Sequence, residues 1–501
     1  MTTVHEENER KYDGALERPL SADGLPQVAQ AVPGGTEKLD AVYFDTPDLR
    51  LLRSGITLRR RRGGADAGWH LKTPGSNGIR VETRLPLDAG RKRRPPKELV
   101  RLTRGAARGE PLAPVARLRT ERVITLLVDA ERRTLAEVVR DRVSAEEPSA
   151  EPSARRAAVT VWEETEVELA DGRPELMDEV EEQLRARGLR RSAASSKLGR
   201  VLGDRLTEGQ EQSEPPAGSV GAALTAYLRE QVAAVRALDP AVRHDRPDSV
   251  HQLRVAVRRI RSALASHRKL LDRDITDPLD KELRWFGKVL GRARDAEVLG
   301  ERLGEQAAEL PAAGRPAEVS ARITARFGRR YRRAHRAALE VMDGRRYFAL
   351  LDAVDRLAAD PPLTRRAERG KAEARRVLKK QRRRTVRRLG TALDLPPGPE
   401  RDAALHRARK AAKRARYTSE SAAPVAGKPA ERLRKNMKRI QKPLGAHQDG
   451  VVAEPAVLDT ADEARHHGED AFGYGLLYAT QRAGEEQQVA DAAKARKKAK
   501  G

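Results

Sequence analysis

One cassette occurs twice in this chain and decides the fold of its second part. It reads HQLRVAVRRIRSA from His251 and HRARKAAKRARYT from His406. Each copy is followed by a second related block, LGRARD ending at Asp295 and LGAHQD ending at Asp449. The copies are separated by 155 residues in the cassettes and 154 in the blocks (406 − 251 and 449 − 295). A repeat preserved over two separate blocks predicts a duplicated helical unit.

The basic residues of each cassette fall on one face of a helix. Positions i, i+3, i+7 and i+10 share a face, and in both copies they hold a histidine followed by three cations. In the first copy Leu253, Val257, Ile260 and Leu264 form a separate apolar stripe for a core. We therefore predict that each helix packs with one face and presents cations to an anionic ligand with the other. The predicted ligand-binding residues are His251, Arg254, Arg258, Arg261, His406, Arg409, Lys413 and Arg416.

The composition limits the possible partners. The 501 residues include 100 Lys and Arg against 74 Asp and Glu, a formal net charge of +26, which favours a polyanionic partner. Aromatic residues make up only 3% of the chain. Proteins that bind single-stranded nucleic acid use such residues for base stacking, so a partner without bases is favoured. Cysteine does not occur in the sequence, which excludes disulfides and thiolate metal sites.

The sequence also bears on location. The N-terminus MTTVHEENERKY is charged where a signal peptide would be apolar. The sequence has no apolar run approaching the length of about 18 residues that a membrane span needs. We therefore expect a cytoplasmic protein that does not enter a membrane.

The chain divides into a strand-rich part and a helical part. Residues 1–203 contain runs that alternate with a period of two, typical of strands, and one helical segment at 174–188. A polar linker follows at 204–217, then a helical domain at 218–490, and a basic, low-complexity tail at 491–501 that we expect to be disordered. The expected strands cover 42–46, 56–62, 68–73, 79–87, 122–129 and 159–169.

Charges of both signs alternate along the expected strands, so that each set points to one side of a sheet. A solvated sheet face is the usual meaning of this pattern, but the opposite side carries Arg60 and Arg62, which leaves little for a core. A closed antiparallel barrel with a polar lumen solves this problem. Inside it, Lys and Arg would bind phosphate oxygens and clustered carboxylates would hold Mg²⁺ or Mn²⁺. These are the parts needed for phosphoryl transfer to water.

The order of these motifs resembles that of CYTH domains, the triphosphate tunnel metalloenzymes that include class IV adenylate cyclases and thiamine triphosphatases. Glu7-Asn-Glu9-Arg-Lys11 has their ExExK form, and YFDT, LRRRR, WHLK, RVETR and EVEL follow in order. The resemblance implies catalytic roles for Glu7, Glu9, Lys11 and Lys72. It implies triphosphate binding by Arg59, Arg61, Arg84, Arg122 and Lys197. It also implies metal binding by Glu7, Glu9, Asp141, Glu166 and Glu168. Many relatives have two adjacent acids where this chain has Arg140 and Asp141.

The two cassettes, each with its LGxxxD block, resemble CHAD domains over about residues 218–490. The resemblance implies two pseudo-symmetric four-helix halves with a basic surface that binds inorganic polyphosphate. Neither His251 nor His406 has a second histidine or a carboxylate at i+3 or i+4. We therefore expect them to bind phosphate or to make a buried hydrogen bond rather than to hold a metal.

Taken together, these features predict an α+β protein with an N-terminal closed antiparallel β-barrel and a C-terminal all-α domain. The predicted function is a metal-dependent hydrolase of inorganic triphosphate, short polyphosphate or an organic triphosphate, with helices that bind inorganic polyphosphate. The alternatives are a non-catalytic polyphosphate receptor or scaffold, a nucleotidyl cyclase, and a nucleic-acid-binding protein. The barrel carboxylates favour the enzyme over the receptor, because a pure anion binder gains nothing from them.

Overall fold

The protein is described by a computed structural model that covers residues 3–75, 79–147, 159–207 and 214–500. The chain forms two compact units. The first comprises residues 1–211 together with Arg236–His244, and the second comprises the remaining residues from Gln212 onward.

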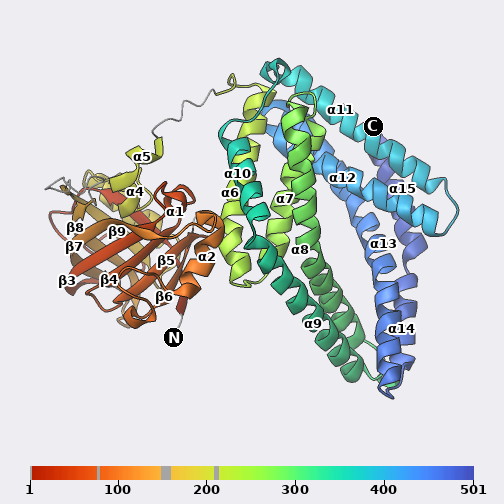
Figure 1. Cartoon of the computed structure of the whole chain (residues 1–501), viewed down its shortest axis with the longest axis horizontal. Helices are drawn as coiled ribbons and strands as arrows, with labels where there is room; N and C mark the ends of the chain where they lie inside the picture. Colours follow the sequence, from red (N-terminus) through yellow and green to blue (C-terminus); the bar gives the residue numbers. More distant parts are fainter. Residues whose placement is uncertain (1–2, 76–78, 148–158, 208–213, 501) are drawn as a thin grey trace. The chain divides into compact units, whose positions relative to one another are not determined.

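The first unit is built around a single antiparallel sheet, which in the described residues has ten strands (Figure 1). The strands follow the order β1-β6-β5-β4-β3-β7-β8-β9-β2-β10 across the sheet. Their bounds are β1 Thr3–Glu7, β2 Glu9–Asp13, β3 Gln30–Asp45, β4 Thr57–Arg62, β5 Gly68–Pro74, β6 Arg80–Leu85, β7 Ala113–Val128, β8 Thr134–Glu146, β9 Val159–Leu169 and β10 Arg190–Arg191.

The sheet is not closed by hydrogen bonds, so the predicted closed barrel is not confirmed. The reason lies in the N-terminal segment, which is divided between two distant places in the strand order. β1 pairs with β6, whereas β2 pairs with β9, and only Asn8 separates the two strands in the chain. The covalent chain, rather than a ladder of hydrogen bonds, therefore joins the two flanks of the sheet at Glu7 and Glu9.

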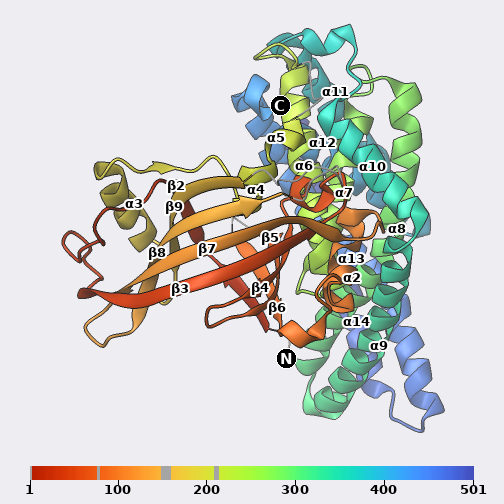
Figure 2. The same cartoon turned by 60° about the vertical axis from the view of Figure 1, so that its left-hand side comes forward.

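Apolar residues of the first unit lie mainly on the outer face of the sheet, beneath short helices. α3 (Leu176–Ala186) packs on β2, β7, β8 and β9 through Leu176, Val180 and Leu184 (Figure 2). α1 (Arg50–Arg53) and α2 (Lys97–Ala107) pack in the same way on β3 to β6, in a cluster that contains Trp69 and Leu99. The opposite face of the sheet carries the charged groups, together with one apolar cluster beneath a further helix.

α4 (Lys197–Leu202) packs on that opposite, inner face. Its Leu198 and Leu202 join a buried cluster with Leu118 of β7 and Trp162 of β9. The Ser196 side chain accepts a hydrogen bond from the Gly199 N–H at 3.0 Å and so begins the helix. α4 thereby holds its first residue among the side chains of the inner face.

The second unit is helical, with ten helices in its described residues if α6, whose last residues from Arg236 onward belong to the first unit, is included. Five of them lie in each repeat, so each half has one helix more than expected. The additional helices are α10 and α15, and each of them buries an apolar stripe. In α10 this stripe includes Leu350 and Val354. The helices are α6 Val220–Arg243, α7 Ser249–Ser266, α8 Arg273–Ala308, α9 Pro316–Met342, α10 Arg345–Ala359, α11 Lys371–Leu393, α12 Pro399–Ala426, α13 Lys428–His466, α14 Phe472–Arg482 and α15 Glu485–Lys500.

The tail predicted to be disordered is helical as far as Lys500, because residues 491–500 belong to α15. Its buried residues recur every three or four positions along the helix. Arg496 also donates a hydrogen bond to the Val386 carbonyl of α11 at 3.1 Å. In the predicted linker, residues 204–207 form the short helix α5 and 208–213 lie outside the described residues.

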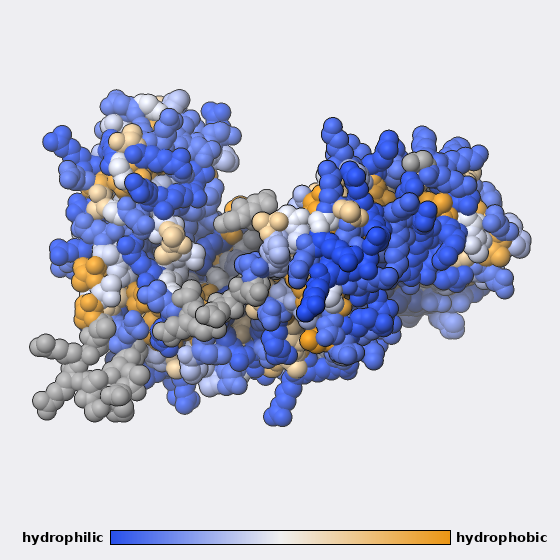
Figure 3. Space-filling model, turned by 90° about the horizontal axis from the view of Figure 1, so that it is seen from above, coloured by the Kyte–Doolittle hydropathy of each residue, from blue (hydrophilic) through white to orange (hydrophobic). Residues whose placement is uncertain are grey.

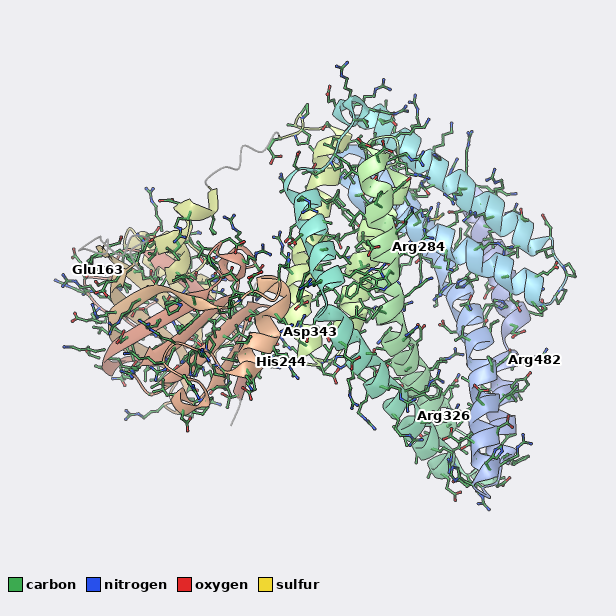
Figure 4. The ribbon with its side chains drawn as sticks, in the orientation of Figure 1. Glu163, His244, Arg284, Arg326, Asp343 and Arg482 are labelled. Carbon is green, nitrogen blue, oxygen red and sulfur yellow. The ribbon has the colours of Figure 1, made fainter. Side chains whose placement is uncertain are left out.

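The two helical halves meet in two places. α7 contacts α12, where Thr418 donates to Ser266 at 2.7 Å and the His267 ring is 3.0 Å from the Ser421 hydroxyl. Farther along, α8 and α9 share an apolar cluster with α13 and α14. Arg326 of α9, labelled in Figure 4, reaches across this second junction to Asp459 and Glu463 of α13.

None of the helices in the described part of the chain combines the length and the apolar character that a bilayer crossing requires. The face of the molecule drawn in Figure 3 is mostly hydrophilic, with hydrophobic residues gathered in small groups.

Candidate functional site

The register of the strands places the charged residues of the sheet on its inner face. Directly opposed residues in an antiparallel pair point to the same side. Such pairs join Lys72 to Glu82 across β5 and β6, and Lys11 to Glu166 across β2 and β9. The same alternation assigns to this face Glu7, Glu9, Lys11, Arg59, Arg61, His70, Lys72, Arg80, Glu82, Arg84, Arg122, Asp141, Glu164, Glu166 and Glu168.

A buried ion-pair network surrounds Lys197, the first residue of α4. Its Nζ lies 2.9 Å from Asp141, 2.7 Å from Glu164 and 2.7 Å from Glu166. Arg122 makes a two-pronged pair with Asp141 at 2.9 and 2.7 Å and approaches Glu166 at 3.0 Å. Burial opposes the charge on Lys197, but the three carboxylates hold its pKa well above the ordinary value. The same ion pairs raise the pKa of Arg122 and lower those of Asp141 and Glu166 in spite of burial, so these three groups and Lys197 remain ionised at neutral pH.

A second group of charges lies where β1 continues into β2. Lys72 pairs with Glu7 at 2.6 Å and with Glu9 at 3.6 Å, and Lys11 pairs with Glu9 at 3.4 Å. Burial raises the pKa of Glu7 to about 7, although the nearby Lys72 works against this shift. For Glu9 burial acts in the same direction, but Lys11 and Lys72 outweigh it and lower the pKa to about 2. Near neutral pH, Glu7 is thus partly protonated, whereas Glu9 is ionised.

Arginines crowd one another in the middle of the inner face. Arg59 of β4 donates to the Tyr43 hydroxyl at 3.3 Å. Burial, followed by the neighbouring charges of Arg59 and Arg122, lowers the pKa of Arg61 to about 9. Asp66 pairs with Arg61 but does not cancel this repulsion. An anion entering here would be stabilised by guanidinium groups that are already held in place.

The helical cassettes repeat one local geometry. In the first half, Arg254 of α7 pairs with Asp295 of α8 at 3.3 Å. In the second half, the corresponding Arg409 of α12 pairs with Asp449 of α13 at 3.7 Å. The duplicated sequence is therefore also duplicated in its contacts.

Glycines of the LGxxxD blocks lie beneath the same two arginines. A Cβ atom added to Gly291 would lie 3.5 Å from the Arg254 guanidinium, and one added to Gly445 would lie 3.8 Å from that of Arg409. Any side chain longer than alanine would take up the space of the guanidinium. The block thus supplies both an acidic partner and room for the arginine.

The two basic stripes converge where α7 contacts α12. Burial, together with Arg409, Arg258 and Arg254, lowers the pKa of Lys413 to about 7. Burial and the charge of Arg258 also contribute to lowering the pKa of Arg254 and of Arg409, despite their aspartate partners. Cations from both halves therefore lie close enough to repel one another.

The far ends of the two stripes are better neutralised than their centre. Arg261 pairs with Asp280 at 2.9 Å, and Arg416 lies 3.8 Å from Glu420. Close to the centre, Arg258 donates to the Tyr417 hydroxyl at 3.2 Å. The uncompensated positive charge is thus concentrated around Lys413.

Comparison with known proteins agrees with this division. The profile of the CYTH domain matches residues 7–198, and that of the CHAD domain matches residues 226–458. Two uncharacterized proteins of Mycobacterium tuberculosis, from strains CDC 1551 and H37Rv, are each 38% identical to this chain over 485 residues. The match covers 95% of this chain and 92% of each relative. The chain belongs to their family, and in this chain a CYTH domain precedes a CHAD domain.

Two solved structures are similar to a part of this chain. PptA from Streptomyces chartreusis is 25% identical, with a TM-score of 0.45, over 56% of this chain and 99% of that one. The CHAD domain from the plant Ricinus communis is 23% identical, with a TM-score of 0.45, over 58% of this chain and 96% of that one.

The CYTH unit has a buried acidic group that could hold a metal ion. Asp141, Glu164 and Glu166 each offer a ligand atom, and these atoms lie within 4.8 Å of one another. Carboxylate oxygens are the ligands that Mg²⁺ and Mn²⁺ prefer, so the donor set fits such an ion. The Lys197 ammonium lies among the same three carboxylates and balances their charge.

The predicted metal ligands are only partly gathered in this acidic group. Asp141 and Glu166 belong to it, whereas Glu7 and Glu9 lie with Lys72 in the second group of charges. Glu168 is opposite Glu9 in the pairing of β9 with β2. The acidic group includes Glu164, which the sequence reasoning did not select. Its alternation with Glu166 and Glu168 was the signal that could have identified it.

Sequence reasoning also assigned no role to a buried pair on β5 and β6. The His70 Nδ1 atom lies 2.9 Å from Glu82, and its Nε2 atom lies 2.9 Å from the Asp66 carbonyl. Burial lowers the pKa of His70 to about 4 despite the Glu82 carboxylate. His70 is therefore neutral at pH 7 and holds Glu82 in place beside Lys72.

The cassette histidines of the CHAD unit lie at the start of the two stripes and are partly exposed. Burial, followed by Arg294, lowers the pKa of His251; burial, followed by Lys410, lowers that of His406. In the described residues, neither histidine belongs to a group of side chains that could hold a metal ion. Both rings are therefore neutral at pH 7, and the His406 ring also has a hydrogen bond with the Gln448 side chain.

Proposed function

We propose that the CYTH unit is a metal-dependent phosphohydrolase and that the CHAD unit binds inorganic polyphosphate. The substrate would be inorganic triphosphate, short polyphosphate or an organic triphosphate. Arg122 supports this proposal most directly, because it belongs to both functional parts of the inner face. It pairs with the acidic residues Asp141 and Glu166, and its charge also acts on the crowded Arg61.

The residues of the inner face divide the work of phosphoryl transfer. Arg59, Arg61 and Arg84 would bind and orient the phosphates, and Lys72 would neutralise their oxygens. Asp141, Glu164 and Glu166 would hold Mg²⁺ or Mn²⁺, which polarises a phosphoryl oxygen and lowers the pKa of bound water.

The remaining inner-face residues would keep these groups in the correct state. Lys197 would stay close to the carboxylates and maintain their ionisation. Glu7, with its pKa raised to about 7 by burial, is suited to accept a proton near neutral pH.

In the CHAD unit, a polyphosphate chain would bind where the cassettes converge. Lys413 has cations around it from both halves, and burial and these neighbours lower its pKa to about 7. A bound polyanion would relieve the repulsion among these groups and restore the proton on Lys413. Each phosphate of the chain carries one negative charge, and a row of cations would neutralise these charges rather than one strong partner.

A second candidate function is a receptor that binds triphosphate without hydrolysing it. The position of Lys197 favours this alternative, because its ammonium already supplies a cation to all three carboxylates of the acidic group. In a receptor, these carboxylates would hold Lys197 and Arg122 in place instead of a metal.

Phosphate release by the full chain distinguishes the two candidates. The substrates to compare are tripolyphosphate, long-chain polyphosphate, ATP and thiamine triphosphate, each with Mg²⁺, with Mn²⁺ and with excess chelator. We expect metal-dependent release from at least one of them. Binding without release under every condition would support the receptor, and cyclic nucleotide formed from ATP would support a cyclase.

A further inference from the structure

Residues of α11, α13 and α15 of the CHAD unit line a separate basic groove. The three helices are labelled in Figure 1. Its volume is about 940 Å³, and its floor includes Leu378, Leu433 and Asn436. Among the described residues that line it, none comes from α7 or α12. The groove is therefore distinct from the place where the two cassettes converge.

Two stripes of cations form the walls of this groove. On α11, Arg375, Lys379 and Arg382 recur at i, i+4 and i+7, and thus lie on one helix face. On α13, the lining cations recur at i, i+4, i+7 and i+11, from Lys428 to Arg439. At a rise of 1.5 Å per residue, the second stripe is about 16 Å long. The two faces thus make an extended anion-binding surface rather than a point site.

The charges of the groove are largely uncompensated by the protein. Glu431 is the one acidic residue among the described lining residues, and it pairs with Lys435 at 3.0 Å. In the described part of the chain, no ion pair involves Arg375, Lys379 or Arg432. These three side chains are exposed and face a groove that already brings their charges together.

We propose that this groove is a second binding site for inorganic polyphosphate, with the chain lying between the stripes of α11 and α13. The inference rests on the polyphosphate binding proposed for the cassettes. A polyanion without bases is favoured over nucleic acid, because none of the described lining residues is aromatic. A long chain could then occupy both sites at once, whereas a short chain would fill them separately.

A comparison of three variants of the full chain tests this site. The groove variant carries Arg375→Ala, Lys379→Ala and Arg432→Ala. The matched control carries Arg332→Ala, Arg333→Ala and Arg336→Ala, which removes the same charge from exposed positions on α9. The cassette variant carries Arg254→Ala and Arg258→Ala. Circular dichroism and melting temperature establish that each variant is folded.

The measurement is calorimetric titration with short-chain polyphosphate of about 16 Å extended length, in excess chelator so that no chain is cleaved. The groove variant should bind one equivalent fewer than the wild type, and the control should bind as many as the wild type. For long-chain polyphosphate, the groove variant should lose about tenfold in affinity. Its dependence of log affinity on log salt should become shallower by about 2.

The outcomes for the two sites are separable. An unchanged stoichiometry in the groove variant would overturn the second site, as would an equal loss in the α9 control. If the cassette variant bound as many equivalents of short-chain polyphosphate as the wild type while the groove variant bound one fewer, the proposed binding by the cassettes would be overturned instead. A groove variant that lost affinity for duplex DNA but kept every equivalent of polyphosphate would overturn the second site in favour of nucleic acid.

Discussion

The inner face of the CYTH sheet and the cassette surface of the CHAD unit both collect cations, but they neutralise them in opposite ways. On the sheet, the cations have carboxylate partners within the same face. The ion pairs hold the pKa values of Lys72, Arg122 and Lys197 above their ordinary values in spite of burial. On the helices, burial and neighbouring cations lower the pKa values of Arg409 and Lys413.

This difference indicates what each surface needs from a ligand. The cassette surface lacks negative charge at its centre, so a polyanion alone would stabilise it. The inner face already contains charges of both signs, so a simple anion would have to compete with its own carboxylates. A triphosphate together with a divalent cation would satisfy both sets of charges. Arg61 departs from this pattern on the inner face, because burial and its arginine neighbours lower its pKa to about 9.

The largest effect should come from removing one carboxylate of the inner face. Glu166→Gln takes a donor from the acidic group and a partner from Arg122 and Lys197. We expect phosphate release to fall by about 10²-fold or more, because the change affects the metal and the positioned cations together. Steady-state turnover of the best substrate measures this loss, and the melting temperature establishes that the variant is folded.

Glu163→Gln is the matched control for this experiment. Glu163, labelled in Figure 4, lies three residues before Glu166 in β9 but points away from the inner face and pairs with Arg140 at 3.3 Å. Turnover in the control should stay near the wild-type value. Equal losses in both variants would mean that the strand, rather than the acidic group, controls activity.

The second largest effect concerns the centre of the cassette surface. Replacing both Arg258 and Lys413 by Ala removes one cation from each half. We expect long-chain polyphosphate to bind about 10 to 100 times more weakly. The slope of log affinity against log salt concentration should become shallower by about 1.5. Fluorescence anisotropy at several salt concentrations measures both quantities. The pair Arg332→Ala and Arg333→Ala is the control for lost net charge, and a similar loss there would argue against a specific surface.

The alternation of charge and the helical repeat made much of this arrangement predictable. Because side chains alternate along strands, Arg59 could be placed on the same side of one strand as Arg61, and Glu166 on the same side of another as Glu168, before any pairing was known. The i, i+3, i+7 spacing likewise predicted that Arg254 and Arg258 share a face. Both arguments depend only on the local geometry of the backbone.

Other features depend on contacts between distant segments, and the sequence did not reveal them. The split of the N-terminal strand at Asn8 and the ion pairs of Lys197 with the acidic group follow from pairing and packing across the sheet. β8 (Thr134–Glu146) was not expected, because apolar and charged residues alternate irregularly along it. Low complexity concealed the helix of the tail, since its buried stripe consists mostly of small alanines.

A smaller effect should appear in the pH dependence of polyphosphate binding. In the free protein, burial and neighbouring cations lower the pKa of Lys413 to about 7, and a bound polyanion would raise this pKa again. Binding therefore takes up a proton above pH 7, and affinity should fall by up to about fivefold between pH 7 and pH 8. His251 and His406 have pKa values lowered by burial, so they titrate below this window.

Two substitutions of Lys413 test the origin of that pH dependence. Lys413→Arg keeps the charge and should bind with a nearly constant affinity from pH 6 to pH 8. Lys413→Met removes the charge and should bind weakly, also with little change over this range. A wild-type pH profile in either protein would show that another group is responsible.

The smallest effect concerns the stability of the CYTH unit. Burial raises the pKa of Glu7 from 4.5 to about 7, so the folded protein keeps a proton that the unfolded chain loses at lower pH. Between these values the folded state binds more protons, and its stability must therefore fall as the pH rises from 4.5 to 7. The slope from this one group is at most about 1.4 kcal/mol per pH unit.

Glu7→Gln cannot titrate and should remove this contribution to the pH dependence of stability, whereas Glu163→Gln on the outer face should leave it unchanged. Chemical unfolding of the three full-length proteins between about pH 5 and pH 7 measures the slopes. If Glu7→Gln retained the wild-type slope, Glu7 would be ionised across this range. The inner face would then be as fully charge-paired at its β1–β2 junction as it is around Lys197.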